Sequence, residues 1–229
     1  MGSGMCIRDR LEGKHPKGEA AAVGDLLGKL HSASTEEAFD ATPFQNYDDF
    51  FALRLEPYLM FTAARHPDVA EKLFALATYL TTANRVLVHG DVSPKNILFR
   101  ESGPIILDAE CATMGDASFD LAFCINHLIL KAVHLPHIRM ALLNSIHAFW
   151  SAYARYIKWE AASAIEERVC KLLPALMLAR VDGKSPVEYL SAEDQSFVRN
   201  SAIRLLQDTP NTLHEFVRII VTALQKERQ

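Results

Sequence analysis

The chain has 229 residues, of which 49% are hydrophobic and 23% are charged, and its formal net charge at pH 7 is -4. This length and composition are those of an ordinary globular protein, able to bury one large core or two small ones. The acidic balance and the lack of a long basic run argue against a nucleic-acid or anionic-membrane surface. No apolar stretch reaches the length of a transmembrane helix. We therefore expect neither nucleic acid nor a membrane as a partner.

The cysteines are widely scattered and form no C-x-x-C pair; they are Cys6, Cys111, Cys124 and Cys170. This pattern suggests reduced thiols in a cytoplasmic protein, without a zinc site or a disulfide framework. At the start of the chain, Met1–Gly4 followed by Met5 resembles a leader or an extended start. We expect residues 1–15 to be unstructured and residues 16–229 to form one domain.

Apolar residues recur at helical spacing in many segments of the chain. We expect helices over residues 18–34, 47–65, 67–82, 117–133, 136–158, 160–180, 192–208 and 211–226. Pro57 predicts a kink in the second of these helices, and Pro174 predicts a kink or break in the sixth. Ser191 and Asp194 form a capping pattern. The segment 117–133 is apolar nearly all round, which is typical of a buried helix.

Three short apolar runs, 86–88, 97–99 and 105–107, are rich in β-branched residues and bounded by glycine and proline. They predict short strands, with a hairpin turn at residues 102–104. Asp91 and Asp108 therefore each follow the end of a strand, where the backbone can direct a side chain outward. This placement is typical of a catalytic site.

The loop after the first strand reads His-Gly-Asp-x-x-x-x-Asn, from His89 to Asn96. This spacing, followed by a strand that ends in Asp108, is the pattern of a phosphoryl-transfer site. The reaction needs a carboxylate that orients and deprotonates a hydroxyl, and oxygen ligands for the magnesium ions on ATP. Asp91 is the candidate base, and Asn96 and Asp108 are the candidate metal and cofactor ligands. A metal-dependent phosphohydrolase is an alternative, although the sequence shows no second cluster of His and Asp ligands.

The segment from Val86 to Glu110 resembles the aminoglycoside phosphotransferase and choline kinase family of small-molecule kinases. Residues 106–110 (ILDAE) fit the I-x-D-x-E pattern of this family, and residues 115–122 fit its G-D-x-x-x-D-L-A pattern. Residues 177–190 (MLARVDGKSPVEYL) also resemble a segment of some bacterial members, for which no role follows from the sequence.

The resemblance implies an α+β fold that is mostly α, namely the helical C-terminal lobe of the protein-kinase-like fold with a small β-hairpin at the catalytic loop. It implies ATP and Mg²⁺ as cofactors and a small molecule with a hydroxyl group as substrate. Glu110 resembles a residue that assists the metal. His89 resembles the histidine that supports the catalytic loop from below, and Asp120 resembles the buried aspartate that ties this loop down.

Three basic residues are candidate site residues, and each has a functional and a structural interpretation. Lys95 stands four residues after Asp91, where tyrosine kinases carry an arginine, and it either steadies the transferred phosphoryl charge or is a solvent-facing lysine. Arg180 and Lys184 either contact an anionic substrate or cap the end of the preceding helix.

The sequence before Val86 lacks the features of the N-terminal β lobe that a kinase needs to hold ATP. It contains no G-x-G-x-x-G loop and no strand of the V-A-I-K type. We consider three explanations: a truncated form of a kinase, a separate polypeptide that supplies the N-terminal lobe, and a catalytically inactive helical binding module.

Overall fold

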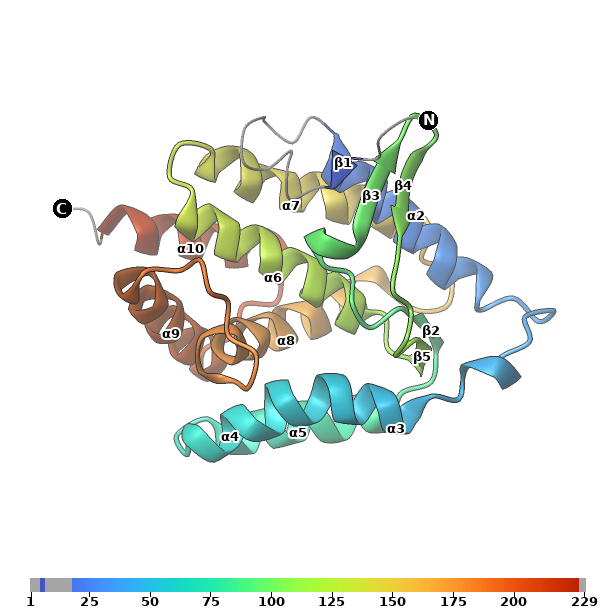
Figure 1. The fold of residues 1–229 in the computed structure, drawn as a ribbon, viewed down its shortest axis with the longest axis horizontal. Helices are drawn as coiled ribbons and strands as arrows, with labels where there is room; N and C mark the ends of the chain where they lie inside the picture. Colours follow the sequence, from blue (N-terminus) through green and yellow to red (C-terminus); the bar gives the residue numbers. More distant parts are fainter. Residues whose placement is uncertain (1–4, 7–17, 227–229) are drawn as a thin grey trace.

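The computed structural model describes residues 5–6 and 18–226, and in these residues the chain is mostly helical (Figure 1). The α-helices are α2 (Glu19–Ala33), α3 (Tyr47–Phe50), α4 (Phe61–Arg65), α5 (Ala70–Thr82), α6 (Ser118–His134), α7 (Arg139–Ala154), α8 (Ala162–Asp182), α9 (Ala192–Gln207) and α10 (Leu213–Lys226). Short segments of other helix types are η1 (Thr42–Phe44), η2 (Phe51–Met60) and η3 (Pro94–Asn96). The helical segments expected from the sequence are all present, so the predicted mostly helical α+β character is confirmed.

The strands form two small antiparallel sheets. They are β1 (Met5–Cys6), β2 (Val86–Val88), β3 (Ile97–Arg100), β4 (Gly103–Ile106) and β5 (Thr113–Gly115). One sheet has the order β1-β3-β4, and β3 and β4 form the expected hairpin, with Ile97 opposite Ile106. The other sheet pairs β2 with β5, with Val86 opposite Gly115. The two sheets bracket the loop 89–96.

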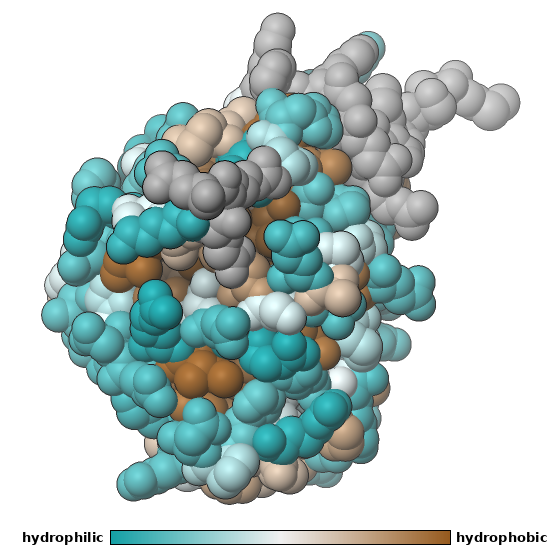
Figure 2. Space-filling view, turned by 90° about the vertical axis from the view of Figure 1, so that its left-hand side faces the viewer, coloured by the Kyte–Doolittle hydropathy of each residue, from teal (hydrophilic) through white to brown (hydrophobic). Residues whose placement is uncertain are grey.

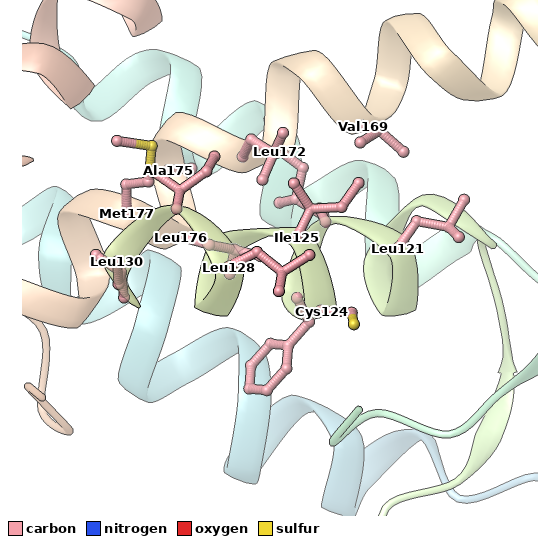
Figure 3. Packing of buried hydrophobic residues seen from close by; sticks show 14 of the residues in the cluster. Leu121, Cys124, Ile125, Leu128, Leu130, Val169, Leu172, Ala175, Leu176 and Met177 are labelled. Carbon is pink, nitrogen blue, oxygen red and sulfur yellow. The ribbon is translucent and has the colours of Figure 1, made fainter. Parts of the chain in front are cut away.

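Helix α6 lies in the middle of the molecule and supplies much of the core. It packs against α7 and α8, while α2 packs along α7 (Figure 1). Between α6 and α8, Leu121, Ile125 and Leu128 of α6 face Leu172 and Leu176 of α8 (Figure 3). Burying one such side chain contributes about 1.5–3 kcal/mol to the free energy of unfolding. The prediction that residues 117–133 form a buried helix is confirmed.

Four local expectations differ from the structure. Helix α8 runs unbroken through Pro174, because its buried faces pack on α6 and α9 and offset the lost hydrogen bond. Pro57 lies inside the π-helical segment η2, whose wider turn accommodates the missing N–H. The turn of the hairpin lies at residues 101–102, one position earlier than expected, and Gly103 already pairs with Arg100.

The fourth difference concerns the expectation that residues 1–15 are unstructured. It is wrong for Met5–Cys6, which forms strand β1 and pairs with β3. The exposed edge of β3 offers unpaired backbone groups, and an extended segment of any sequence can satisfy them. The other residues of 1–15 lie outside the described part of the chain.

The surface view in Figure 2 shows a face on which hydrophilic residues predominate and hydrophobic patches are small and separated. In the part of the chain that the structure describes, no helix is long and apolar enough to cross a membrane. Cys111, Cys124 and Cys170 are buried free cysteines. Burial raises the pKa of the Cys111 thiol to about 11.

Candidate active site

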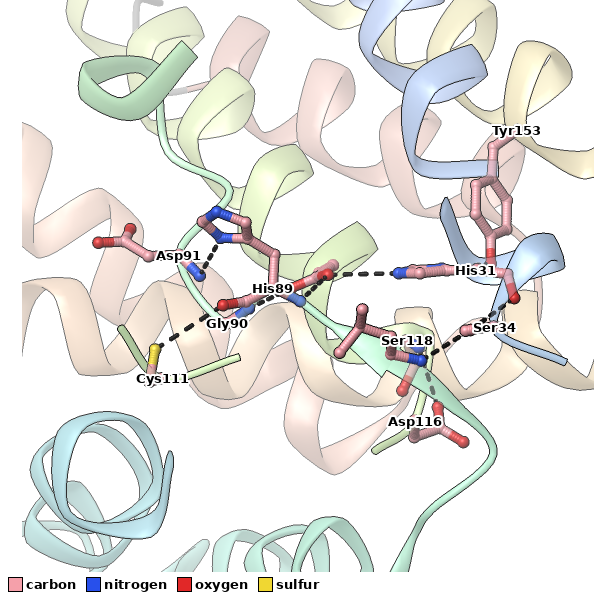
Figure 4. A network of polar contacts seen from close by, with 11 residues as sticks. His31, Ser34, His89, Gly90, Asp91, Cys111, Asp116, Ser118 and Tyr153 are labelled. Carbon is pink, nitrogen blue, oxygen red and sulfur yellow. Dashed lines mark hydrogen bonds and ion pairs between the residues drawn. The ribbon is translucent and has the colours of Figure 1, made fainter. Parts of the chain in front are cut away.

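The loop after β2 is fixed from below by the carboxylate of Asp120, which lies fully buried in the first turn of α6. Its two oxygens accept hydrogen bonds from the backbone N–H groups of His89, at 2.7 Å, and Gly90, at 2.8 Å. The ring Nε2 of His31 lies 3.3 Å from Asp120 Oδ2, and its Nδ1 lies 2.9 Å from the hydroxyl of Tyr153 (Figure 4). The loop that carries Asp91 thus rests on a buried polar network centred on Asp120.

The geometry of the loop depends on Gly90 and on the ring of His89. Gly90 has φ +82°, a conformation that favours glycine, and a Cβ there would lie 2.8 Å from the sulfur of Cys111. The Nδ1 of His89 lies 3.2 Å from the backbone nitrogen of Asp91 and accepts its N–H. These contacts turn the Asp91 side chain to the side of the loop opposite His31 (Figure 4).

The Asp91 carboxylate is buried and contacts two cations. Its Oδ2 lies 3.2 Å from Nη2 of Arg54 and 3.2 Å from Nζ of Lys95. Burial alone would raise the pKa of Asp91, but the charges of Arg54 and Lys95 outweigh burial and hold this pKa below its usual value. Asp91 is therefore ionised at neutral pH and able to accept a hydrogen bond from a substrate hydroxyl.

Asn96 and the strand end before Asp108 are tied to the same loop. The buried Asn96 side chain donates through Nδ2 to the Asp91 carbonyl at 3.2 Å, which leaves its Oδ1 as a potential ligand oxygen. The Asn96 carbonyl accepts the N–H of Leu107 at 2.8 Å. Asp108 follows directly, with an exposed side chain and φ +67°, a left-handed conformation that aspartate tolerates better than most residues. The structure therefore brings Asp91, Asn96 and Asp108 to one end of the β3–β4 hairpin.

Glu110 lies two residues further along the same exposed turn, and its carbonyl accepts a hydrogen bond from Nδ2 of Asn46 at 2.8 Å. Within residues 18–226, no group of three or more His, Cys, Asp or Glu side chains is arranged to hold a metal ion. The oxygen donors of Asn96 and Asp108 nevertheless match the preference of Mg²⁺ for few protein ligands plus substrate phosphates.

Asp91 opens into a cleft of about 720 Å³. One wall carries Asp91, Lys95 and Arg54, and the opposite wall carries Arg180 with the residues that follow α8. Lys184 lies outside the cleft lining, and its ammonium pairs with Glu56 at 2.7 Å. Of the two basic residues singled out in the GKSP region, the structure places Arg180 in the cleft.

Two residues of this site escape sequence reasoning. Arg54 pairs with Asp91 and also donates through Nε to the Gly90 carbonyl, yet it stands inside a helical segment with no motif around it. His31 supports Asp120 from a helix that begins the described domain. Neither has a local sequence signal, because both act across long stretches of chain.

The described residues form a mostly helical α+β structure that is consistent with a kinase-like fold. Its cleft is lined by Asp91, which lies on the loop 89–96. Residues 2–156 match the phosphotransferase enzyme family (APH), and the chain belongs to this family. It is 26% identical over 181 residues to methylthioribose kinase of Bacillus velezensis, an alignment that covers 66% of this chain and 45% of that enzyme. The aligned part thus spans about half the length of this relative.

Among solved structures, the chain resembles the amicoumacin kinase hAmiN, solved in complex with AMP-PNP, Ca²⁺ and Ami. The TM-score is 0.59 at 16% identity, and the match covers 94% of this chain and 66% of that one. A glucosamine kinase structure aligns with a TM-score of 0.43 at 17% identity over 97% of this chain and 54% of its own. The likeness to the amicoumacin kinase supports the fold.

Proposed function

We propose that this chain carries the substrate and metal side of an ATP-dependent kinase that phosphorylates a hydroxyl group of a small molecule. The observation that carries the proposal is the placement of Asp91 in a cleft large enough for a small molecule, with Asn96 and the strand end before Asp108 tied to the same loop. Family membership supports the reaction type.

Each residue takes a role that its surroundings support. Asp91 holds the substrate hydroxyl and accepts its proton, and its ionised state suits this task. Lys95, which contacts Asp91 and has a largely exposed side chain, steadies charge on the transferred phosphoryl group. Asp120 and His89 act through the backbone of the loop and keep Asp91 in place.

Asn96 and Asp108 are the residues that would hold Mg²⁺ with ATP, and Glu110 would assist from the exposed turn. When bound, the metal supplies positive charge that neutralises the phosphates. The chain's own contribution is to fix Asn96 through the Asp91 carbonyl and to present Asp108 at the end of β4.

The sequence before Val86 shows none of the residues that grip the nucleotide from an N-terminal lobe. We propose that this lobe is supplied either by a longer form of the protein or by a separate polypeptide.

A second candidate is an inactive kinase-like binding module. The observation that favours it is the ion pair between Arg54 and Asp91, at 3.2 Å, which engages the proposed base. In an active enzyme this pair must open or share Asp91 with the substrate hydroxyl.

The test is phosphate transfer from ATP to a panel of small polyols and amino alcohols, with and without a supplied N-terminal lobe. For an active acceptor, we expect Asp91→Asn to lower kcat by about 10²- to 10⁴-fold, the usual contribution of a general base. ATP binding should be nearly unchanged. Transfer that is retained in Arg54→Gln supports the kinase. Transfer that is absent from the parent chain and from every variant, Arg54→Gln included, supports the binding module.

A further inference from the structure

The chain that follows Arg180 lines the same cleft as Asp91. Residues 180–189, here called the 180–189 segment, contribute Arg180, Ser185 and Tyr189 to the cleft lining. This segment is part of residues 177–190, which resemble a segment of some bacterial family members. The proposed phosphoryl transfer assigns these residues no role. A substrate whose hydroxyl reaches the Asp91 carboxylate must lie in this cleft, and so beside the 180–189 segment.

The 180–189 segment is held rigidly by its neighbours. Buried Asp182 forms two bonds with Arg199, at 2.6 and 2.7 Å, and lies 2.9 Å from Nε2 of His66. At Gly183 the backbone passes so close to the Ala179 carbonyl that an added Cβ would overlap its oxygen. A wall fixed in this way can position a ligand without the entropic cost of ordering a loop.

Two cations are presented on this side of the cleft. The Nη1 of Arg180 donates to the Tyr58 hydroxyl at 3.2 Å and to the Ser185 carbonyl, while its Nε is shielded from water and has no hydrogen-bond partner in the described residues. The ammonium of Lys131 lies 4.1 Å from the ring centre of Tyr189, whose hydroxyl is also buried without a partner among those residues. Leaving such donors unpaired is costly, and both Arg180 and Tyr189 line the cleft.

The charge balance of the cleft favours an anion. The formally charged side chains that line it are Arg54, Lys95, Lys131, Arg180, Asp91 and Glu188. Arg54 and Lys95 both contact Asp91, so they belong to the catalytic wall. On the opposite wall Arg180 and Lys131 face a single acid, Glu188, which is exposed. A cationic substrate would meet net repulsion here.

His127 lies in the same cleft and is uncharged. Burial and the charges of Arg180, Lys131 and Lys95 lower its pKa to about 3, against a smaller opposing effect of Asp91. Its imidazole therefore adds a neutral hydrogen-bonding group and no further charge at physiological pH.

We propose that Arg180 and Lys131, with the hydroxyl of Tyr189, bind an anionic group of the substrate, a carboxylate or a phosphate monoester, while Asp91 takes its hydroxyl. This inference rests on the proposed kinase function and adds the substrate class. A guanidinium with Nε and an Nη edge is suited to oxygen pairs of either anion. The 180–189 segment is then the specificity wall of the site.

The experiment measures binding calorimetrically with matched ligands on one scaffold: D-glucose, D-glucuronate, glucose 6-phosphate and D-glucosamine. A second series on a three-carbon scaffold has the same neutral, carboxylate, phosphate and amine members: glycerol, D-glycerate, glycerol 3-phosphate and serinol. We expect an anionic member to bind at least about tenfold more tightly than its neutral and cationic counterparts. The carboxylate and phosphate arms distinguish the two anions.

Arg180→Gln and Lys131→Gln should each remove about tenfold of this preference, and Tyr189→Phe should remove a smaller part. Tyr189→Phe deletes only a hydroxyl that has no partner in the described residues, so it tests the site even if Arg180→Gln unfolds the chain. Matched controls are Lys171→Gln on α8 and Arg218→Gln on α10, both exposed and outside the cleft, which should change nothing.

An equal or tighter affinity for the cationic members, or no measurable anion binding, overturns the inference. It is also overturned if Arg180→Gln weakens Mg²⁺·ATP but leaves the anionic acceptors unchanged, because the cations then serve the nucleotide. Failure of the kinase assignment has a different signature: anion preference persists, but ATP does not bind and no phosphate is transferred.

Discussion

The two walls of the cleft are built on opposite principles. The wall that carries Asp91 depends on one buried carboxylate, Asp120, which accepts the N–H groups of His89 and Gly90. The wall that carries Arg180 depends on close backbone packing at Gly183 and on the ion pair of Asp182 with Arg199. The first wall is recognisable from its spacing in the sequence, whereas the second is visible there only as an unexplained stretch of residues.

The difference teaches how local a functional signal is. A loop that does chemistry needs fixed residue types at short spacing, so it leaves a motif. A wall that positions a substrate needs only a shape, and its contacts join residues far apart in the sequence, such as Lys184 with Glu56. If this contrast is right, the two walls should respond differently to substitution.

The largest expected effect on stability is at Asp120. Asp120→Ala leaves the buried N–H groups of His89 and Gly90 without an acceptor, so we expect the free energy of unfolding to fall by about 3–5 kcal/mol. Urea unfolding measures this loss. Asp68→Ala, at an exposed carboxylate, is the control and should change it by less than about 0.5 kcal/mol. A loss below about 1 kcal/mol at Asp120 would show that the loop does not depend on this anchor.

The opposite wall should instead fail through steric overlap. Gly183→Ala places a Cβ against the Ala179 carbonyl oxygen and 3.1 Å from that of Pro57, both backbone atoms. We expect a loss of about 1–3 kcal/mol in urea unfolding, together with weaker substrate binding.

Gly18→Ala is the matched control for this substitution. Gly18 has φ +85°, but no heavy atom lies within 4 Å of the position that the added methyl group would take. Only the backbone cost of about 1 kcal/mol therefore applies there. If Gly183→Ala and Gly18→Ala cost the same and Gly183→Ala leaves substrate binding intact, close packing does not fix the 180–189 segment.

The third effect is a pH dependence at His127, which also lines the cleft. Its pKa in the folded chain, about 3, lies below the ordinary value of 6.5. Between these values the unfolded chain binds the extra proton, so this histidine's stabilising contribution is complete above about pH 6.5 and is lost as the pH falls.

We therefore expect His127→Gln to flatten the rise of stability with pH between about pH 4 and 6 by up to about 1.4 kcal/mol per pH unit. The measurement is urea unfolding at several pH values. The exposed His137, changed to Gln, should leave the slope unchanged. A slope that His127→Gln does not alter would place this ring in contact with water.

The sequence predicts features that depend on neighbouring residues better than features that depend on residues far apart in the chain. Periodicity predicts helices such as α6, and spacing predicts the hairpin and the positions of Asp91, Asn96 and Asp108, because these are properties of neighbouring residues. One partner of Asp91, Arg54, and one partner of Asp120, His31, escape prediction. Arg54 reaches Gly90 across 36 residues, and His31 reaches Asp120 across 89. Such contacts depend on how helices pack.

The short strands show a further limit. Strand β5 has no strand pattern in the sequence, yet it pairs with β2. Its three residues are too few to show an alternating pattern, and the partner strand alone decides its conformation. The same holds for Met5–Cys6 beside β3.

The central claim is that Asn96 and Asp108 hold a metal with ATP, and calorimetric titration with Mg²⁺ and ATP tests it most directly. We expect Mg²⁺-dependent binding of ATP that weakens at least about tenfold in Asp108→Ala, the loss of one charged ligand. Glu101→Ala, at the exposed turn of the same hairpin, should bind as the parent chain does. Binding that is independent of Mg²⁺, unchanged in Asp108→Ala, or absent would contradict the account.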